Sequence, residues 1–191
     1  MYTSRAPMAL SSTPRPLHVA LRPAQPDDAG LLYRWRGEPS VRRHQPLAEA
    51  SIADLRADLL RHRHDELYRC RGDRYQWIVL VAGEAAGWIT VAVSSWEHGL
   101  AEIGYALSSP FQGRGVMRSA LEQLAGELFA NTVLDRLEAR CSVENLASQR
   151  VLEAVGFARE GRLRSYFRLD GQRVDNFLYA LLRDEFLGRA G

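Results

Sequence analysis

The sequence predicts a mixed α/β domain of the α+β kind, with one central sheet of about seven mostly antiparallel strands flanked by helices. Three β-rich stretches between residues 76 and 107 are separated only by short turns, as in an antiparallel meander. After Pro110, helical and strand-like patterns alternate. Asp170-Gly171 separates two further strand-like stretches, and this dipeptide is a strong signal for a tight hairpin.

Capping residues support the individual helices. Asp27 and Asp28 can cap the first helix, and Ser51 can cap the second. Gly156 can supply the left-handed residue that commonly ends a helix. The expected helices are one that runs through Trp35 and those at 51–60, 117–129 and 146–155. The expected strands are 17–22, 76–82, 87–94, 100–107, 135–141, 157–169 and 173–182.

Length and charge exclude several classes of partner. The 191 residues suffice for one domain with a buried core, expected at 17–191 after a loose, flexible tail at 1–16. The formal net charge of +2 is too small to indicate a nucleic acid or a membrane surface as a partner. No segment is long and apolar enough for a membrane helix, and the tail lacks the apolar centre of a secretory signal. We therefore expect a cytoplasmic protein with neither a nucleic-acid nor a membrane partner.

Cysteines and histidines do not predict a metal site. Cys70 and Cys141 are the only cysteines, and neither has the spacing of a metal ligand. His62 and His64 flank Arg63 in a polar stretch, where a solvated surface is the more common explanation. We therefore expect no metal.

A glycine-rich loop, Gln112-Gly113-Arg114-Gly115, lies between an expected strand and an expected helix. Glycine lets the backbone approach a ligand closely, and the helix directs its free N–H groups and positive dipole end at the loop. This arrangement favours an anion such as a pyrophosphate, and Arg114 adds a positive charge. The Gly-x-Gly pattern alone is weak, because it also occurs in plain turns. It lacks the third glycine of the dinucleotide fingerprint and the Gly-Lys-Ser/Thr of a P-loop.

Two long motifs resemble those of the GNAT acetyltransferase superfamily. Residues 103–117 (IGYALSSPFQGRGVM) resemble its motif A, Gln/Arg-x-x-Gly-x-Gly/Ala after a strand. Residues 145–157 (NLASQRVLEAVGF) resemble the pattern Asn-x-x-Ser-x-Arg-Val-Leu-x-x-x-Gly-Phe of the branch that contains the ribosomal-protein N-terminal acetyltransferases. The opening, at 21–29, is also similar, so the resemblance extends in the family's order over residues 21–182. Met117 departs from the Gly or Ala of motif A but can still offer its backbone N–H.

The resemblance implies transfer of the acetyl group of acetyl-CoA to a free amine, with coenzyme A as the product. The sheet would be splayed in the middle, where the pantetheine arm would run beside the strand that ends at Leu107. The Leu107 N–H would stabilise the negative charge on the thioester oxygen. Asn145 would hold the arm and Ser148 would protonate the thiolate, although both residues could instead cap a helix. The residues expected at the cofactor are Leu107, Gln112, Gly113, Arg114, Gly115, Val116, Met117, Asn145 and Ser148.

The group that takes the proton of the amine is expected beside the acetyl site. Glu102 is the first candidate, and the alternation of the strand places it on the face away from Tyr105. Tyr105 is the second candidate, for proton relay or for positioning the amine, and Glu144 could also face the cleft. A solvent-facing Glu102, with deprotonation in bulk water, is the alternative. The expected catalytic residues are Glu102, Ser148 and Tyr105.

The amine acceptor is expected near the early helices and the last hairpin, which often borders the acceptor site in this family. Trp35 could line the entrance or be buried, and Tyr166 and Asp175 lie on the hairpin strands, where Asp175 could meet a cationic amine or simply face solvent. The branch resemblance favours the N-terminal α-amine of a protein, of the ribosomal-protein type. A small amine (antibiotic, polyamine or amino-acid derivative) and a non-catalytic acetyl-CoA sensor are the alternatives. A homodimer is compatible with the family.

Overall fold

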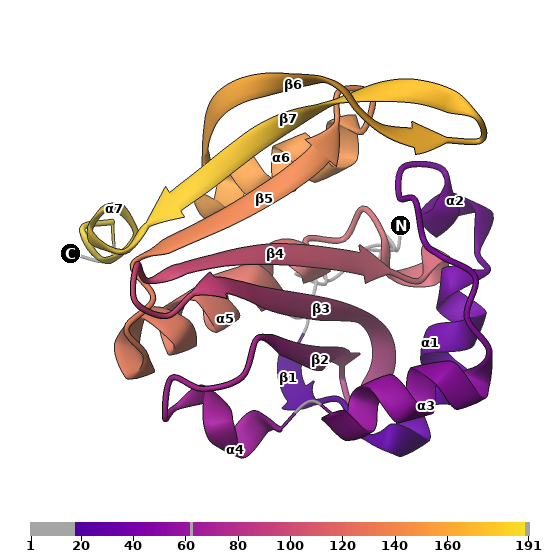
Figure 1. Ribbon diagram of the computed structural model, residues 1–191, viewed down its shortest axis with the longest axis horizontal. Helices are drawn as coiled ribbons and strands as arrows, with labels where there is room; N and C mark the ends of the chain where they lie inside the picture. The colour runs from indigo at the N-terminus through magenta and orange to yellow at the C-terminus, as the bar shows by residue number, and fades with distance from the viewer. Residues whose placement is uncertain (1–17, 62, 190–191) are drawn as a thin grey trace, which may run out of the picture.

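The structure, a computed structural model, describes residues 18–61 and 63–189. Its strands are β1 Val19–Pro23, β2 Arg74–Val81, β3 Glu84–Ser95, β4 Leu100–Leu107, β5 Arg136–Ser142, β6 Ala158–Leu169 and β7 Gln172–Leu182. They form one seven-stranded sheet in the order β1-β2-β3-β4-β5-β7-β6 (Figure 1). All neighbours are antiparallel except β4 and β5. The mixed, mostly antiparallel sheet is therefore confirmed, whereas the tail expected at 1–16 lies outside the described residues.

The four expected helices are present, together with shorter helices that were not expected. The longer helices are α1 Ala29–Arg36, α3 Ile52–Arg61, α5 Val116–Asn131 and α6 Leu146–Val155. The shorter helices are η1 Pro26–Asp28, α2 Pro39–Arg42, α4 His64–Leu67, η2 Ser109–Phe111 and α7 Arg183–Leu187. A helix of five residues or fewer spans too few turns to produce a periodic apolar pattern, which explains why the sequence did not predict them.

Helices cover both faces of the sheet (Figure 1). On one face, α5 and α6 pack on residues such as Ile89 and Ile103. On the other face, α1 and α3 pack on Trp88 and Ala106. Successive side chains of a strand point to opposite faces, so one strand serves both cores. Each fully buried leucine or isoleucine contributes about 1.5–3 kcal/mol relative to exposure.

The sheet is splayed between β4 and β5. These two strands are paired only from Leu100↔Arg136 to Ile103↔Ala139. Both strands continue beyond that point, and they diverge (Figure 1). The gap implied by the family resemblance is therefore present. Since the strands no longer bond to each other there, the backbone groups of β4 that face the gap are available to other partners.

The predicted side-chain cap is present in one helix and absent in another. Ser51 caps α3, because the Asp54 N–H donates to Ser51 Oγ at 3.1 Å. Asp28 forms no side-chain cap on α1. Its carboxylate instead accepts from Arg22 at 2.6 and 2.7 Å and from the Gln25 N–H at 2.7 Å, so that it closes η1 and ties it to β1.

Candidate active site

The glycine-rich loop opens into free space at the beginning of α5. Gly113 and Gly115 have φ angles of +71° and +75°, a conformation that side chains rarely adopt, and Gly115 is the N-cap of the helix. A methyl group built on either glycine would have no atom within 4 Å. Val116 and Met117 are buried beneath the loop, so the departure at Met117 is accommodated in the core. The loop therefore presents backbone N–H groups of a helix N-terminus to solvent, which fits a phosphate group.

The Gln112 side chain braces this loop. Its Nε2 donates to the Leu107 carbonyl at 2.8 Å and to Ser40 Oγ at 3.3 Å. Glu38 ties the same region to the end of α1, since it accepts from Ser108 Oγ at 2.7 Å and from the Ser109 N–H at 2.8 Å. These contacts hold the loop at the end of β4, and a direct contact of the Gln112 side chain with a cofactor stays a prediction.

The Leu107 N–H points into the gap. In an antiparallel pair, alternate residues direct their backbone groups to opposite sides. Ser108 N–H donates to the Ala86 carbonyl on β3 at 2.8 Å, so the backbone groups of Leu107 and Tyr105 face away from β3. The Tyr105 carbonyl also points away from β3, because it accepts a hydrogen bond from Gln45 Nε2 at 2.7 Å. The geometry at Leu107 is therefore suited to an oxyanion donor.

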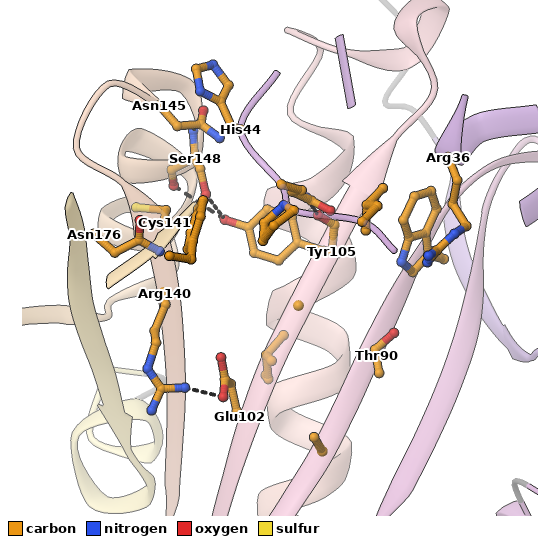
Figure 2. Close-up of a pocket in the computed structure, with 18 of the residues that line it drawn as sticks. Arg36, His44, Thr90, Glu102, Tyr105, Arg140, Cys141, Asn145, Ser148 and Asn176 are labelled. Atoms are coloured by element: carbon orange, nitrogen blue, oxygen red, sulfur yellow. Dashed lines mark hydrogen bonds and ion pairs between the residues drawn. The ribbon is translucent and has the colours of Figure 1, made fainter. Parts of the chain in front are cut away.

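Tyr105 and Ser148 meet across the gap from β4 and α6. Tyr105 Oη lies 2.8 Å from Ser148 Oγ, and Figure 2 shows the two side chains directed at one another. Burial raises the pKa of Tyr105 well above its ordinary value, so the side chain is a neutral phenol at physiological pH. The neutral phenol can share a hydrogen bond with Ser148 or relay a proton, but it is not a base that could hold a proton taken from an amine.

Asn145 caps α6. Its Oδ1 accepts from the Ser148 N–H at 3.1 Å, which confirms the capping interpretation. The carboxamide nitrogen is not needed for the cap and stays available as a donor. The cap also fixes Ser148 in the first turn of α6, where its hydroxyl faces Tyr105.

Cys141 lies on β5 in the wall of the gap. It is a free, buried cysteine, and burial raises the pKa of its thiol to about 11. The thiol therefore stays protonated at neutral pH, and only the thiolate is an effective nucleophile. This favours direct transfer to the amine over an acyl-cysteine intermediate.

Glu102 forms an ion pair with Arg140, which projects from β5 (Figure 2). Arg140 also lies 3.4 Å from Glu138 and 5.6 Å from the centre of the Tyr166 ring. As the alternation predicted, Glu102 lies on the face opposite Tyr105, and its side chain is 39% exposed. The ion pair that orients Glu102 could not be predicted from the sequence, because 38 residues separate Glu102 from Arg140.

A cavity of about 390 Å³ lies on the α1 and α3 face of the sheet and extends to the gap. Among the expected site residues, those that line this cavity are Glu102, Tyr105, Asn145, Ser148 and Tyr166. The phosphate loop, Glu144, Trp35 and Asp175 are not part of its wall. The structure thus brings Tyr105, Asn145 and Ser148 at the gap together with Tyr166, one of the three residues expected to bind the acceptor.

Trp35 and Asp175 lie beside this cavity without lining it. Trp35 is buried and stacks on Trp88, with ring centres 6.2 Å apart, and it is Trp88 that lines the cavity. Asp175 accepts from Arg162 and from the Ser165 N–H, each at 2.7 Å. Both residues therefore have structural contacts, and their expected role in binding the acceptor stays untested.

Most of the lining residues were not predicted, and His44 and Asn176 are two polar examples. Burial and the nearby Arg43 lower the pKa of His44, so its imidazole is neutral at pH 7. Asn176 is buried, and its Oδ1 has no hydrogen-bond partner within the described part of the chain. Figure 2 shows both near Asn145 and Cys141. The alternation of β7 could have singled out Asn176 over its neighbour Asp175, whereas His44 lies in a segment without periodicity.

Residues 18–61 and 63–189 contain neither a cluster of metal ligands nor a membrane-spanning helix. No group of three His, Cys, Asp or Glu side chains there could hold a metal ion. No helix in these ranges is long and apolar enough to cross a membrane. His62 lies outside the described residues, and His64 Nε2 is 2.8 Å from the Gln76 carbonyl.

Known proteins share this fold and sequence pattern. The acetyltransferase (GNAT) domain family matches residues 18–158. The N-acetyltransferase p20 of Bacillus licheniformis is 28% identical over 170 residues, which cover 89% of this chain and 96% of that protein. The spermidine N(1)-acetyltransferase of Escherichia coli K12 is 25% identical over 173 residues, 88% of each chain.

A solved structure has a similar fold. The structure of Mycobacterium smegmatis RimJ in complex with CoA-disulfide superimposes with a TM-score of 0.75 at 26% identity, and the match covers 91% of this chain and 89% of that one. The family match spans well over half of the chain and includes both the loop and the gap. The chain therefore belongs to the GNAT acetyltransferase family and is an N-acetyltransferase.

Proposed function

We propose that the protein transfers the acetyl group of acetyl-CoA to the N-terminal α-amine of a protein. The observation that carries the proposal is the charge of the cavity beside the gap. Its wall holds the arginines Arg36, Arg74 and Arg140 but only one carboxylate, that of Glu102. A polyamine carries several positive charges, and this wall would repel them. A single α-amine loses its charge before it attacks, and the motif at 145–157 resembles that of the ribosomal-protein branch.

The cofactor fits the residues present. The N–H groups at Gly113 to Met117 would hold the pyrophosphate, and the gap between β4 and β5 would take the pantetheine arm. Acetyl-CoA, when bound, supplies a thioester that an amine can attack. The Leu107 N–H would donate to the thioester oxygen and stabilise its developing negative charge. This donor is held in place by β3 and costs no reorganisation during the reaction.

Two proton transfers complete the proposal. Glu102 would accept the proton of the amine, directly or through a water molecule, since it lines the cavity in which the acceptor would bind. Ser148 Oγ would donate a proton to the sulfur of coenzyme A as it leaves, and the Tyr105 phenol, 2.8 Å away, would pass a proton to Ser148 while it takes one from water. The second proton that the nitrogen loses as the amide forms would go to water.

Calorimetric titration with acetyl-CoA, paired with a thiol-release assay, tests the proposal. The acceptors are peptides with free and with blocked α-amines, spermidine and amino-acid derivatives, and mass spectrometry locates the added acetyl group. The chain contains no lysine, so acetylation of its own side-chain amines cannot contribute to the signal. We expect release with free α-amines only. Release with spermidine alone would assign the protein to small amines, and binding without release on any amine would indicate a sensor.

A further inference from the structure

The cavity has an unbalanced positive charge at the end away from the gap. Of its three arginines, Arg140 is paired with Glu102. Arg36 projects from α1 and Arg74 begins β2, and neither forms an ion pair within the described residues. Figure 2 shows Arg36 across the cavity from Ser148 and Asn145. Two positive charges therefore face the part of the cavity that an acceptor would occupy beyond its amine.

Arg36 has few partners for its guanidinium group. Its one hydrogen bond among the described residues is from Nη2 to the Ala48 carbonyl, at 2.9 Å. Partial burial lowers its pKa, and the nearby Arg74 and Arg42 lower it further. Asp58 opposes this effect, but its carboxylate pairs with Arg61 at 2.5 Å. A buried cation next to other cations is costly unless an anion joins it.

Arg74, the first residue of β2, lines the same cavity. Its side chain is exposed, and no hydrogen bond holds it in the part of the chain that the structure describes. An unconstrained arginine beside a half-buried one can close on an anion between them. The planar guanidinium group matches a carboxylate with two parallel hydrogen bonds.

We infer that Arg36 and Arg74 form a binding site for a carboxylate of the acceptor. The inference rests on the proposed function, because it places the amine at the gap and the carboxylate at the far end of the same cavity. In a protein acceptor the carboxylate comes from an aspartate or glutamate shortly after the N-terminus. A small amine that carries its own carboxylate offers the same chemistry. Arg36 and Arg74 are therefore specificity-determining residues for acidic acceptors.

The test compares six-residue peptides with a free α-amine whose second to fourth residues are all Glu, all Gln or all Arg. For the unaltered protein we expect kcat/KM to be highest with Glu, by roughly 30-fold over Gln, as for charge-assisted hydrogen bonds. Arg74→Gln should remove most of this preference by raising KM and leave kcat unchanged. Arg74→Glu should invert the preference toward the Arg peptide, which a merely structural role could not do.

Arg34→Gln is the matched control, since Arg34 is an exposed residue of the same helix as Arg36 and does not line this cavity. It should keep the preference for Glu. Arg36→Gln should behave like Arg74→Gln, and an unchanged melting temperature would show that the contact with Ala48 is not responsible.

The outcomes separate this inference from the proposed function. Equal turnover of all three peptides would overturn the carboxylate site and leave the α-amine reaction intact. Turnover of small carboxylate-bearing amines with the same Arg74 dependence, and of no peptide, would retain the site and overturn the protein acceptor. If no acceptor is turned over, calorimetric titration of the Glu and Gln peptides into the protein with coenzyme A decides. Equal affinity would then contradict the site.

Discussion

The regions that we propose to bind the cofactor and the acceptor, called the cofactor side and the acceptor side below, are built in different ways. The cofactor side consists of the loop at 112–117, the gap between β4 and β5 and the first turn of α6. Its binding groups are mostly backbone N–H groups. The acceptor side is a cavity between α1, α3 and the sheet, and its binding groups are side chains.

This difference determines which side a sequence reveals. Backbone recognition requires glycines and a helix start in consecutive positions, so it leaves a contiguous motif. Side-chain recognition requires only that residues meet in space. Arg36, Arg74, Arg140 and Asn176 come from α1, β2, β5 and β7, and no short pattern connects them. Changes to the two sides should accordingly affect different steps of the reaction.

The largest effect is expected from Gly115→Trp. An indole at the N-cap would fill the space in front of α5 and displace the pyrophosphate from the N–H groups. We expect the affinity for acetyl-CoA to fall at least about 100-fold, the equivalent of two lost charge-assisted hydrogen bonds. Calorimetric titration measures this directly, and a near-normal affinity would show that the loop is not the phosphate site.

Gly171→Trp is the control for backbone strain. Gly171 has a φ of +78° and, like Gly115, free space around its α-carbon, but it lies at the tip of the β6–β7 hairpin. The strain of the two substitutions should be similar, whereas only the loop variant should lose acetyl-CoA binding.

The second prediction concerns the gap. Ser148→Ala removes the proposed proton donor and leaves the Asn145 cap intact, because that cap uses the backbone N–H. We expect kcat to fall about 100-fold, the lower end of general acid catalysis, with little change in acetyl-CoA affinity. Tyr105→Phe should cause a smaller loss, since it keeps Ser148. An unchanged kcat in Ser148→Ala would make Ser148 a helix residue only.

The fold and the open glycine-rich loop at the start of α5 could be predicted because their determinants are local. Alternation located every strand within three residues, and Asp170-Gly171, with φ angles of +48° and +78°, made the expected hairpin turn. The splay and the roles at Leu107 and Ser148 came from the family resemblance, since nothing local requires two parallel strands to separate.

The acceptor side could not be predicted in the same way. The sequence is compatible with Trp35 at the entrance or in the core, and the structure buries it against Trp88, behind the cavity wall. The charge of Asp175 suggests contact with a cationic amine or with solvent. A bulge in β6 lets Asp175 bind the Ser165 N–H, whereas its neighbour Asn176 lines the cavity, so that a role of Asp175 in binding the acceptor stays a prediction. A residue type suggests a chemistry, whereas its position depends on register and packing that only the folded chain provides.

The smallest effect is expected from Gly104→Val, which tests whether the acceptor side can be changed alone. Gly104 lies on β4 in the cavity wall, and a methyl group built on it would contact nothing within 4 Å. Valine favours a strand and would reduce the space for the acceptor, so we expect KM for the amine to rise about 10-fold, as for moderate overpacking. Gly161→Val, at an equally open strand position outside the cavity, is the control. Steady-state kinetics against both substrates measures the effect, and a loss of acetyl-CoA affinity in the Gly104 variant would mean that the two sides are not independent.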